Sequence, residues 1–243
     1  MIYTNKQYKV NIVYNIIGNG NWLVVLHGWG SNRNVFANIA VNLNYKCLLI
    51  DIPPFGESSE LNQDWTIPMY ADLINQMLLE LQIHNPTIMA HSFGGRIALE
   101  LAYKYQNIRK LILTGSAGVS RKSLKVKSKI LLNKVKKTLL KNVKNNKHNG
   151  SPDYLALPPV MKKTFQNIVN HDQTSQLKYI NCPTLIIWGQ NDTETPLQDA
   201  KTLSQKIKNS QLIIFKSCGH FCFLEQTALF SQIVYNYINE GDY

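Results

Sequence analysis

The stretch Thr87-Ile88-Met89-Ala90-His91-Ser92-Phe93-Gly94-Gly95 decides the fold, because an apolar run passes through a small, glycine-rich turn into a segment with helical spacing. A serine between a strand and a helix, with Gly94 two residues later, is typical of the sharp turn that holds a nucleophilic hydroxyl at the carboxyl edge of a sheet. Ala90 stands where such turns more often have glycine. The same short pattern also occurs in ordinary strand-to-helix turns, so its role depends on what the rest of the chain supplies.

Short runs of β-branched and large apolar residues alternate with helical patterns along the 243 residues. This alternation predicts an α/β fold with a doubly wound, mostly parallel sheet. The later runs lack polar alternation, as parallel strands buried on both faces do. The predicted strands are 10–17, 22–26, 47–50, 87–90, 108–113, 184–188 and 212–215, and the predicted helices are 67–81, 93–105, 197–207 and 224–238.

The alternation is interrupted between residues 117 and 175. Within this segment, apolar residues at helical spacing and lysines on another face predict an amphipathic, basic helix, followed by a second helix over 160–169. We therefore expect residues 1–116 and 176–243 to form one α/β core and residues 117–175 to form a helical, basic lid over one end of the sheet. The lysines of the basic face are Lys134, Lys137, Lys141 and Lys144.

The formal net charge of +11 comes from one segment, because Arg121 to Lys147 contains eleven basic residues and no acidic one. Such a field attracts anionic partners, and we expect an acidic carrier protein, a CoA ester or an anionic membrane surface. The alternative is a solvated lid whose lysines reflect a chain rich in Asn, Lys and Ile. Nucleic acid is not expected, because basic and aromatic residues do not interleave.

The four cysteines are too few for a disulfide scaffold, and they form no zinc-binding pattern with histidines. We predict reduced thiols, no metal and no cofactor. The first residues lack a signal-peptide pattern and no run approaches the length of a membrane span, which favours a cytoplasmic protein.

A serine nucleophile needs a neighbouring imidazole, and His220 is the best placed of the six histidines. It follows directly after the last predicted strand, so it emerges at the same sheet edge as Ser92. His91 adjoins the serine, and its side chain is expected to point the other way. His148 and His171 lie in or near the polar insertion and are predicted to be solvated loop residues.

The imidazole in turn needs a carboxylate that fixes its tautomer. Asp192 lies on the loop after the predicted strand 184–188, at the same edge as His220. The other usual position, after the strand 108–113, offers no carboxylate. Asp192 is therefore the predicted acid, and Glu194 is the competing choice.

Acyl transfer also needs donors for the oxyanion. The strand 22–26 runs into His27-Gly28-Trp29-Gly30, whose glycines allow the backbone to turn toward the site. We predict that the backbone amides of Trp29 and Phe93 form the oxyanion hole. His27 is predicted to brace this loop through hydrogen bonds.

Taken together, these motifs resemble the α/β-hydrolase superfamily in its chain order of serine, acid and histidine. Its form and size are most similar to small bacterial carboxylesterases, including pimeloyl-acyl-carrier-protein methyl ester esterases, where the segment after the sixth strand is a lid. The motifs are His27-Gly28-Trp29-Gly30, Asp51-Ile52-Pro53-Pro54-Phe55-Gly56-Glu57-Ser58, Ala90 to Gly95, Trp188 to Pro196 and Gly219-His220.

The resemblance implies a serine hydrolase that cleaves a carboxylic ester through an acyl-enzyme. In this hypothesis Ser92 attacks, His220 transfers the proton and Asp192 orients His220. Alternatives with the same residues are a thioesterase, a C–C bond hydrolase and a cofactor-free perhydrolase. A further alternative is a ligand-sensing receptor of this fold that does not turn over.

Overall fold

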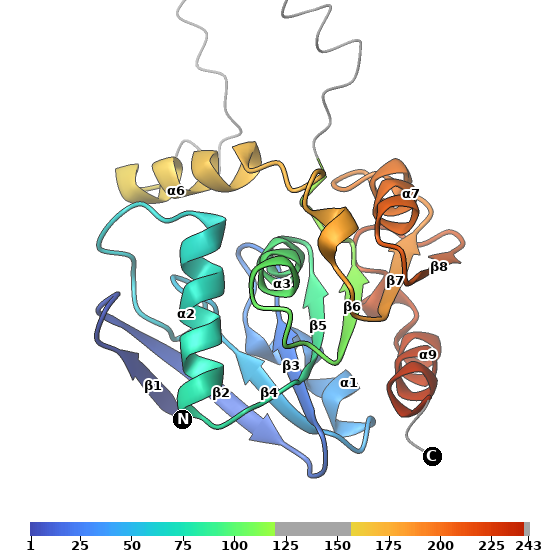
Figure 1. The fold of residues 1–243 in the computed structure, drawn as a ribbon, viewed down its shortest axis with the longest axis horizontal. Helices are drawn as coiled ribbons and strands as arrows, with labels where there is room; N and C mark the ends of the chain where they lie inside the picture. Colours follow the sequence, from blue (N-terminus) through green and yellow to red (C-terminus); the bar gives the residue numbers. More distant parts are fainter. Residues whose placement is uncertain (120–156, 241–243) are drawn as a thin grey trace, which may run out of the picture.

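Eight strands form one sheet in the computed structural model, which describes residues 1–119 and 157–240 (Figure 1). Strands β3 to β8 pair in parallel, and β1 and β2 add an antiparallel edge. The order across the sheet is β1-β2-β4-β3-β5-β6-β7-β8. The strands are β1 (Ile2–Asn5), β2 (Val10–Ile17), β3 (Trp22–Leu26), β4 (Lys46–Ile50), β5 (Thr87–His91), β6 (Lys110–Thr114), β7 (Thr184–Gly189) and β8 (Ser210–Phe215).

The predicted α/β architecture is confirmed, with local differences. Strand β1 was not predicted. It has only four residues, and its extended conformation is stabilised by antiparallel pairing with β2. The strand expected over 108–113 begins later, at Lys110. The helix expected over 224–238 is two helices, α8 (Cys222–Glu225) and α9 (Thr227–Asn239), separated at Gln226 by a non-helical backbone.

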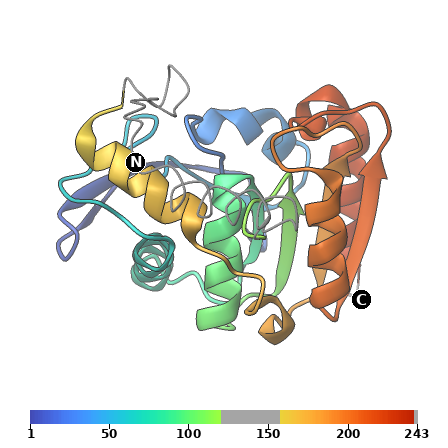
Figure 2. The ribbon, with the colours of Figure 1, turned by 90° about the horizontal axis from the view of Figure 1, so that it is seen from above.

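Helices cover both faces of the sheet (Figure 2). One face is covered by α2 (Ile67–Glu80), α3 (Phe93–Lys104) and α7 (Leu197–Lys206), and the other by α1 (Ala37–Val41) and α9. Each face buries its own apolar cluster, so the sheet is apolar on both sides. This explains why the central strands lack polar alternation.

The strand order reverses next to β3, which pairs with β4 on one side and with β5 on the other. In open α/β sheets, ligands bind in the crevice at the carboxyl ends of the strands where the order reverses. The loop after β3 begins with His27, and the turn after β5 holds Ser92. The topology therefore brings these two motifs to one crevice.

Helix α6 (Pro159–Asn170) lies across this end of the sheet, above α2 and α3 (Figures 1 and 2). It corresponds to the helix predicted over 160–169. Its Thr164 is buried and accepts a hydrogen bond from the amide of Trp65 at 3.0 Å. The predicted basic helix, with Lys134, Lys137, Lys141 and Lys144, lies outside the described residues.

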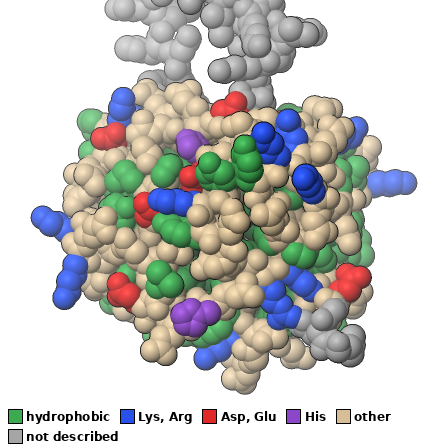
Figure 3. Space-filling view, in the orientation of Figure 1, with side chains coloured by type: hydrophobic (Ala, Val, Ile, Leu, Met, Phe, Trp, Pro, Cys, Tyr) green, Lys and Arg blue, Asp and Glu red, His purple; other side chains and the backbone are tan. Residues whose placement is uncertain are grey.

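Figure 3 shows basic and acidic side chains spread over the face seen in Figure 1. Within residues 1–119 and 157–240, no helix combines the length and apolar character needed to cross a membrane.

Candidate active site

Ser92 occupies a strained turn between β5 and α3, with φ 51° and ψ −111°. A non-glycine residue with positive φ is uncommon, and such strain often marks functional sites. The glycines of the turn are required by close packing. A Cβ on Gly94 would lie 2.4 Å from the carbonyl oxygen of Leu26, and one on Gly95 would lie 2.0 Å from Oγ of Ser116. The turn therefore matches the expected elbow.

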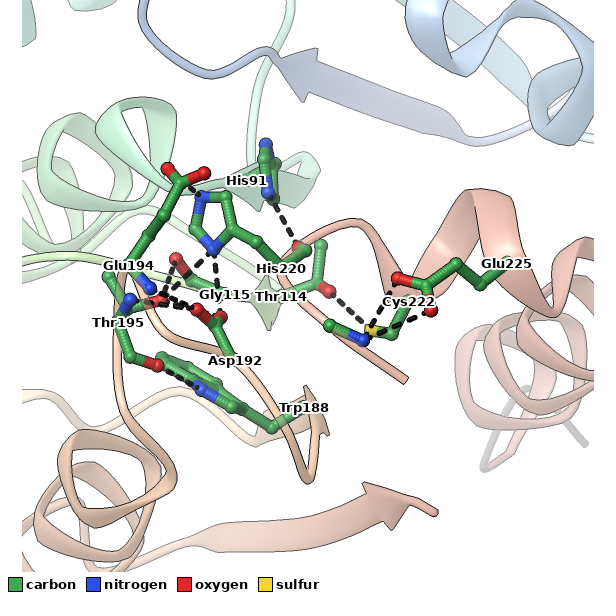
Figure 4. Close-up of polar contacts among 11 residues, drawn as sticks. His91, Thr114, Gly115, Trp188, Asp192, Glu194, Thr195, His220, Cys222 and Glu225 are labelled. Atoms are coloured by element: carbon green, nitrogen blue, oxygen red, sulfur yellow. Dashed lines mark hydrogen bonds and ion pairs between the residues drawn. The ribbon is translucent and has the colours of Figure 1, made fainter. Parts of the chain in front are cut away.

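His220 and Asp192 form a buried contact, with Nδ1 of the imidazole 2.8 Å from Oδ2 of the carboxylate (Figure 4). Oδ1 of Asp192 accepts hydrogen bonds from the amides of Glu194 and Thr195, at 2.9 and 2.8 Å. Burial alone would raise the pKa of Asp192, but the hydrogen bonds from His220 and Thr195 outweigh it and lower the pKa. Asp192 is therefore held in its ionised form.

Thr195 supports this pair and was not predicted. Its hydroxyl lies 2.8 Å from Oδ2 of Asp192, 3.2 Å from Nδ1 of His220 and 3.0 Å from the carbonyl oxygen of Gly115. The available signal in the sequence was Asp192 itself, since an aspartate in a turn commonly accepts a hydrogen bond from the backbone amide two residues later, as it does here from Glu194.

Glu194 lies on the other side of the same imidazole, with Oε2 3.4 Å from Nε2 of His220 (Figure 4). Its side chain is 64% exposed, whereas that of Asp192 is fully buried. Because Nδ1 donates to Asp192, Nε2 of a neutral ring is an acceptor, and its contact with a carboxylate becomes favourable when that nitrogen is protonated.

His91 packs against His220, with ring centroids 4.6 Å apart, and its Nε2–H donates to the backbone carbonyl of His220 at 3.1 Å. Burial lowers the pKa of His91 to about 3, so the ring stays neutral. The His91 side chain therefore holds the loop that carries His220. This role could not be predicted from the strand pattern around His91.

The same loop is held from the other side by Glu225, whose two carboxylate oxygens both accept from the amide of Gly219 at 3.0 Å (Figure 4). Cys222 contacts the hydroxyl of Thr114 through its thiol at 3.4 Å. Burial raises the pKa of this thiol to about 11, which makes it a weak nucleophile.

His27 braces the loop after β3, as predicted. Its Nδ1–H donates to the carbonyl of Gly28 at 2.7 Å, and its Nε2 accepts from the amide of Ile52 at 2.9 Å. This pattern requires the neutral ring, and burial lowers the pKa of His27 accordingly.

The amides of Trp29 and Phe93 both belong to residues that line one cavity. Phe93 is the first residue of α3, and a helix leaves its first amides without an internal partner. Within the described part of the chain, neither amide donates to a protein acceptor. The assignment of an oxyanion hole to them remains a prediction.

The cavity has a volume of about 930 Å³, and Ser92 and His220 both line it. Asp192 lies behind the imidazole. The hydroxyl of Ser92 makes no hydrogen bond to His220 among the described residues, and such bonds are often long before a substrate is bound.

His171 lies in the loop after α6, as expected, but it is only partly exposed and has polar partners that were not predicted. Its Nε2 lies 3.2 Å from Oε2 of Glu100, and its backbone carbonyl accepts from the guanidinium of Arg96 at 2.7 Å. Glu100 and Arg96 are buried on α3, and buried charged groups need polar partners. This explains why His171 is held against the helix. His171 therefore joins the cavity wall to the helix that follows Ser92.

The residues 1–119 and 157–240 contain no group of three His, Cys, Asp or Glu side chains placed to hold a metal ion. All four cysteines are free thiols.

An open parallel sheet with a strained serine after β5, a carboxylate after β7 and an imidazole after β8 is the arrangement of α/β hydrolases. A family profile described as alpha/beta hydrolase fold matches residues 21–227. The chain therefore belongs to the α/β-hydrolase family, as its motifs predicted.

Relatives and solved structures agree with this assignment. The AB hydrolase superfamily protein YisY of Bacillus subtilis is 23% identical over 98% of both chains. A 2-hydroxy-6-oxononadienedioate/2-hydroxy-6-oxononatrienedioate hydrolase of Cupriavidus pinatubonensis is 27% identical over 89% of this chain and 86% of the relative. The esterase EaEST of Exiguobacterium antarcticum has a TM-score of 0.79 at 23% identity and covers 98% of this chain and 99% of its own. This structural match shows the fold.

Proposed function

We propose that this hydrolase of α/β fold is a serine hydrolase that cleaves a carboxylic ester through an acyl-enzyme. Ser92 is the nucleophile, His220 the general base and acid, and Asp192 the residue that orients His220. The observation that carries the proposal is the strained serine on the wall of the same cavity as an imidazole whose far nitrogen is held by a buried carboxylate.

The proton moves along this arrangement. Because Nδ1 of His220 donates to Asp192, the neutral ring leaves Nε2 free to accept the proton of the Ser92 hydroxyl as it attacks the ester carbonyl. The imidazolium then donates this proton to the departing alcohol. A water activated by the same ring releases the acid in the second half of the reaction.

Three further groups stabilise the charges that develop during the reaction, on the oxyanion of the substrate and on the imidazolium of His220. The amides of Trp29 and Phe93 bind the oxyanion, and losing one such donor typically costs about 100- to 1,000-fold in rate. The exposed carboxylate of Glu194 stabilises the imidazolium at Nε2 only weakly, because water and salt screen the contact. No resident metal or cofactor takes part in this scheme.

A second candidate keeps the same residues and cleaves a C–C bond. The names of relatives support it, since one is a 2-hydroxy-6-oxononadienedioate hydrolase. The name of EaEST, an esterase, supports the first candidate. Parallel assays of a butyrate ester, a butyryl thioester and a ring-cleavage dienoate separate the reactions, and ester hydrolysis as the fastest is the expected result.

The test of the nucleophile is labelling with a fluorophosphonate. The wild type is expected to be labelled on Ser92 and S92A is not. Ser31 also lines the cavity, so S31A is the matched control and should still be labelled. Steady release of butyrate by the unlabelled wild type distinguishes an enzyme from a receptor, which would stop after one equivalent. Labelling that persists in S92A would contradict the proposal.

A further inference from the structure

The hydroxyl of Thr195 lies where the loops after three neighbouring strands meet (Figure 4). Gly115 follows β6, Asp192 follows β7 and His220 follows β8. The hydroxyl oxygen is at most 3.2 Å from a polar atom of each of these residues. Thr195 is only 5% exposed, so these contacts are largely shielded from water. One buried group thus links the carboxylate and the imidazole to the sheet edge beside them.

The imidazole of His220 packs directly against the backbone of Gly115. This glycine has a positive φ of 51°, and a Cβ built on it would lie 3.1 Å from both Nδ1 and Cε1 of the ring. The ring therefore lies close against the chain that leaves β6. Because the hydroxyl of Thr195 is 3.0 Å from the carbonyl oxygen of Gly115, it ties the loop that carries Asp192 to the surface on which the ring lies.

The backbone of Thr195 is itself held on both sides. Its amide donates to Oδ1 of Asp192 at 2.8 Å, and its carbonyl accepts from the indole Nε1–H of Trp188 at 2.7 Å. Trp188 is fully buried near the end of β7, so it is a rigid anchor. A side chain on a backbone fixed in this way is already in place before a substrate binds.

The hydroxyl acts on the same carboxylate oxygen as the imidazole. Oδ2 of Asp192 lies 2.8 Å from Nδ1 of His220 and also 2.8 Å from Oγ1 of Thr195. A hydroxyl has one proton, and an ionised carboxylate is its strongest acceptor here. Burial opposes the ionised form of Asp192, and the hydrogen bonds from His220 and Thr195 lower its pKa in spite of it. The hydroxyl therefore helps to set both the rotation and the charge of the carboxylate.

We propose, on the basis of the ester hydrolysis proposed above, that Thr195 is a positioning residue of the reaction. Its hydroxyl holds the carboxylate of Asp192 and the ring of His220 in the geometry in which Nδ1 carries the proton. Nε2 is then left to accept the proton of Ser92. Because the hydroxyl acts through Asp192 and His220, its loss should lower kcat much more than it raises KM.

The experiment compares T195V, T195S and T193V. T195V removes the hydroxyl and keeps a branched side chain, so kcat for p-nitrophenyl butyrate should fall about 10- to 100-fold, with KM changed less than about threefold. T195S keeps the hydroxyl and should retain most of kcat. Thr193 is exposed on the same loop and lies outside the cavity lining, so T193V is the matched control and should behave as the wild type.

A double-variant cycle separates positioning from a general loss of structure. If the hydroxyl acts through Asp192, T195V should slow fluorophosphonate labelling of Ser92 about tenfold or more in the wild type, but less than about threefold in the D192N background. A hydroxyl that only supports folding would cost the same factor in both backgrounds, and that result would overturn the inference. Urea denaturation checks that each variant is folded, and T195A replaces T195V if the valine variant is not.

The remaining outcomes are also decisive. A T195V variant with the kcat of the wild type would contradict the inference and leave ester hydrolysis by Ser92 intact. A T195S variant as slow as T195V would show that the shape of the side chain matters rather than its hydroxyl, which also contradicts the inference. If the wild type hydrolyses no ester and takes up no fluorophosphonate, the proposed function itself fails, and the role of Thr195 in it fails too.

Discussion

Asp192 and Glu194 present their carboxylates to opposite nitrogens of one imidazole, 2.8 Å from Nδ1 and 3.4 Å from Nε2 of His220. The two contacts differ in their surroundings, because the Asp192 side chain is fully buried and the Glu194 side chain is 64% exposed. A buried charged hydrogen bond fixes geometry, whereas an exposed ion pair contributes little because water and salt screen it. The acid that orients the base is therefore Asp192 in our proposal.

Exchanging each acid for its amide tests this assignment. We expect D192N to lower kcat for a neutral butyrate ester by about 10³- to 10⁴-fold, because an amide favours the wrong tautomer of His220. E194Q removes an exposed contact, so its loss should stay below about tenfold. Steady-state kinetics of both variants measure this. A larger loss in E194Q than in D192N would reverse the two roles.

Because Gly95 packs closely against Ser116, we expect a second substitution at Ser116 to restore a destabilised G95A variant. G95A would place its Cβ 2.0 Å from Oγ of Ser116, and overpacking of this kind costs about 1–3 kcal/mol. The double variant G95A/S116G removes the clashing atoms and should regain most of the stability and activity. Urea denaturation and ester hydrolysis report both, with S116G alone as the control. A double variant no better than G95A would show that the turn fails for another reason.

The neutral, buried His91 predicts a loss of stability in acid. Its pKa is about 3 in the folded protein against an ordinary 6.5, so below pH 6.5 the unfolded chain binds the proton first. The free energy of unfolding should therefore fall as the pH drops from 6.5 toward 3, by about 1.4 kcal/mol per pH unit from this group. Asp192, with its lowered pKa, adds to the loss only below about pH 4.

Variant H91Q keeps a hydrogen-bond donor and removes the titration. Between pH 7.5 and pH 5 it should lose about 2 kcal/mol less than the wild type, measured by urea denaturation at each pH. His84 is exposed and outside the cavity, so H84Q should follow the wild type. Equal pH dependence in H91Q and the wild type would exclude His91 as the cause.

Much of the architecture could be predicted because it depends on local patterns. Buried parallel strands require continuous apolar runs, and the elbow and its glycines follow from short-range sterics, so the sheet and the Ser92 turn were found from spacing alone. Strand β1 could not be predicted, because four residues are too few to show a hydrophobic period. Their conformation comes from pairing with β2.

The residues that hold the site in place were harder to predict. Thr195 and His91 act through contacts with His220, which is 25 and 129 positions away in the chain. His171 looked like a loop residue, and only the fold shows that Glu100 of α3 lies beside it. A pattern in one sequence shows which chemical groups are available, and the tertiary structure determines which of them meet.

Lys110, at the start of β6, predicts a stability effect far from the cavity. Its ammonium is buried and donates to the carbonyls of Tyr237, Ile238 and Glu240 at 2.8, 3.1 and 2.6 Å, which caps the end of α9. K110M would leave these acceptors unpaired and should cost about 2–4 kcal/mol in urea denaturation. The matched control is K104M. Its exposed pair with Asp72 should be worth no more than about 1 kcal/mol, and equal losses would contradict the capping role.

The basic segment, Arg121 to Lys147, provides the last test. Outside Arg121 to Lys147 the chain has 15 basic and 15 acidic residues, so any long-range attraction of anions comes from this segment. Exchange of Lys134, Lys137, Lys141 and Lys144 for glutamine should lower kcat/KM for butyryl-CoA or a butyryl carrier protein severalfold, and less at high salt. Hydrolysis of p-nitrophenyl butyrate, which carries no charge, should change little. Equal effects on both substrates would mean that the lysines act through folding rather than charge. A loss confined to the anionic substrates would show that these lysines attract a charged carrier and are not needed for ester hydrolysis itself.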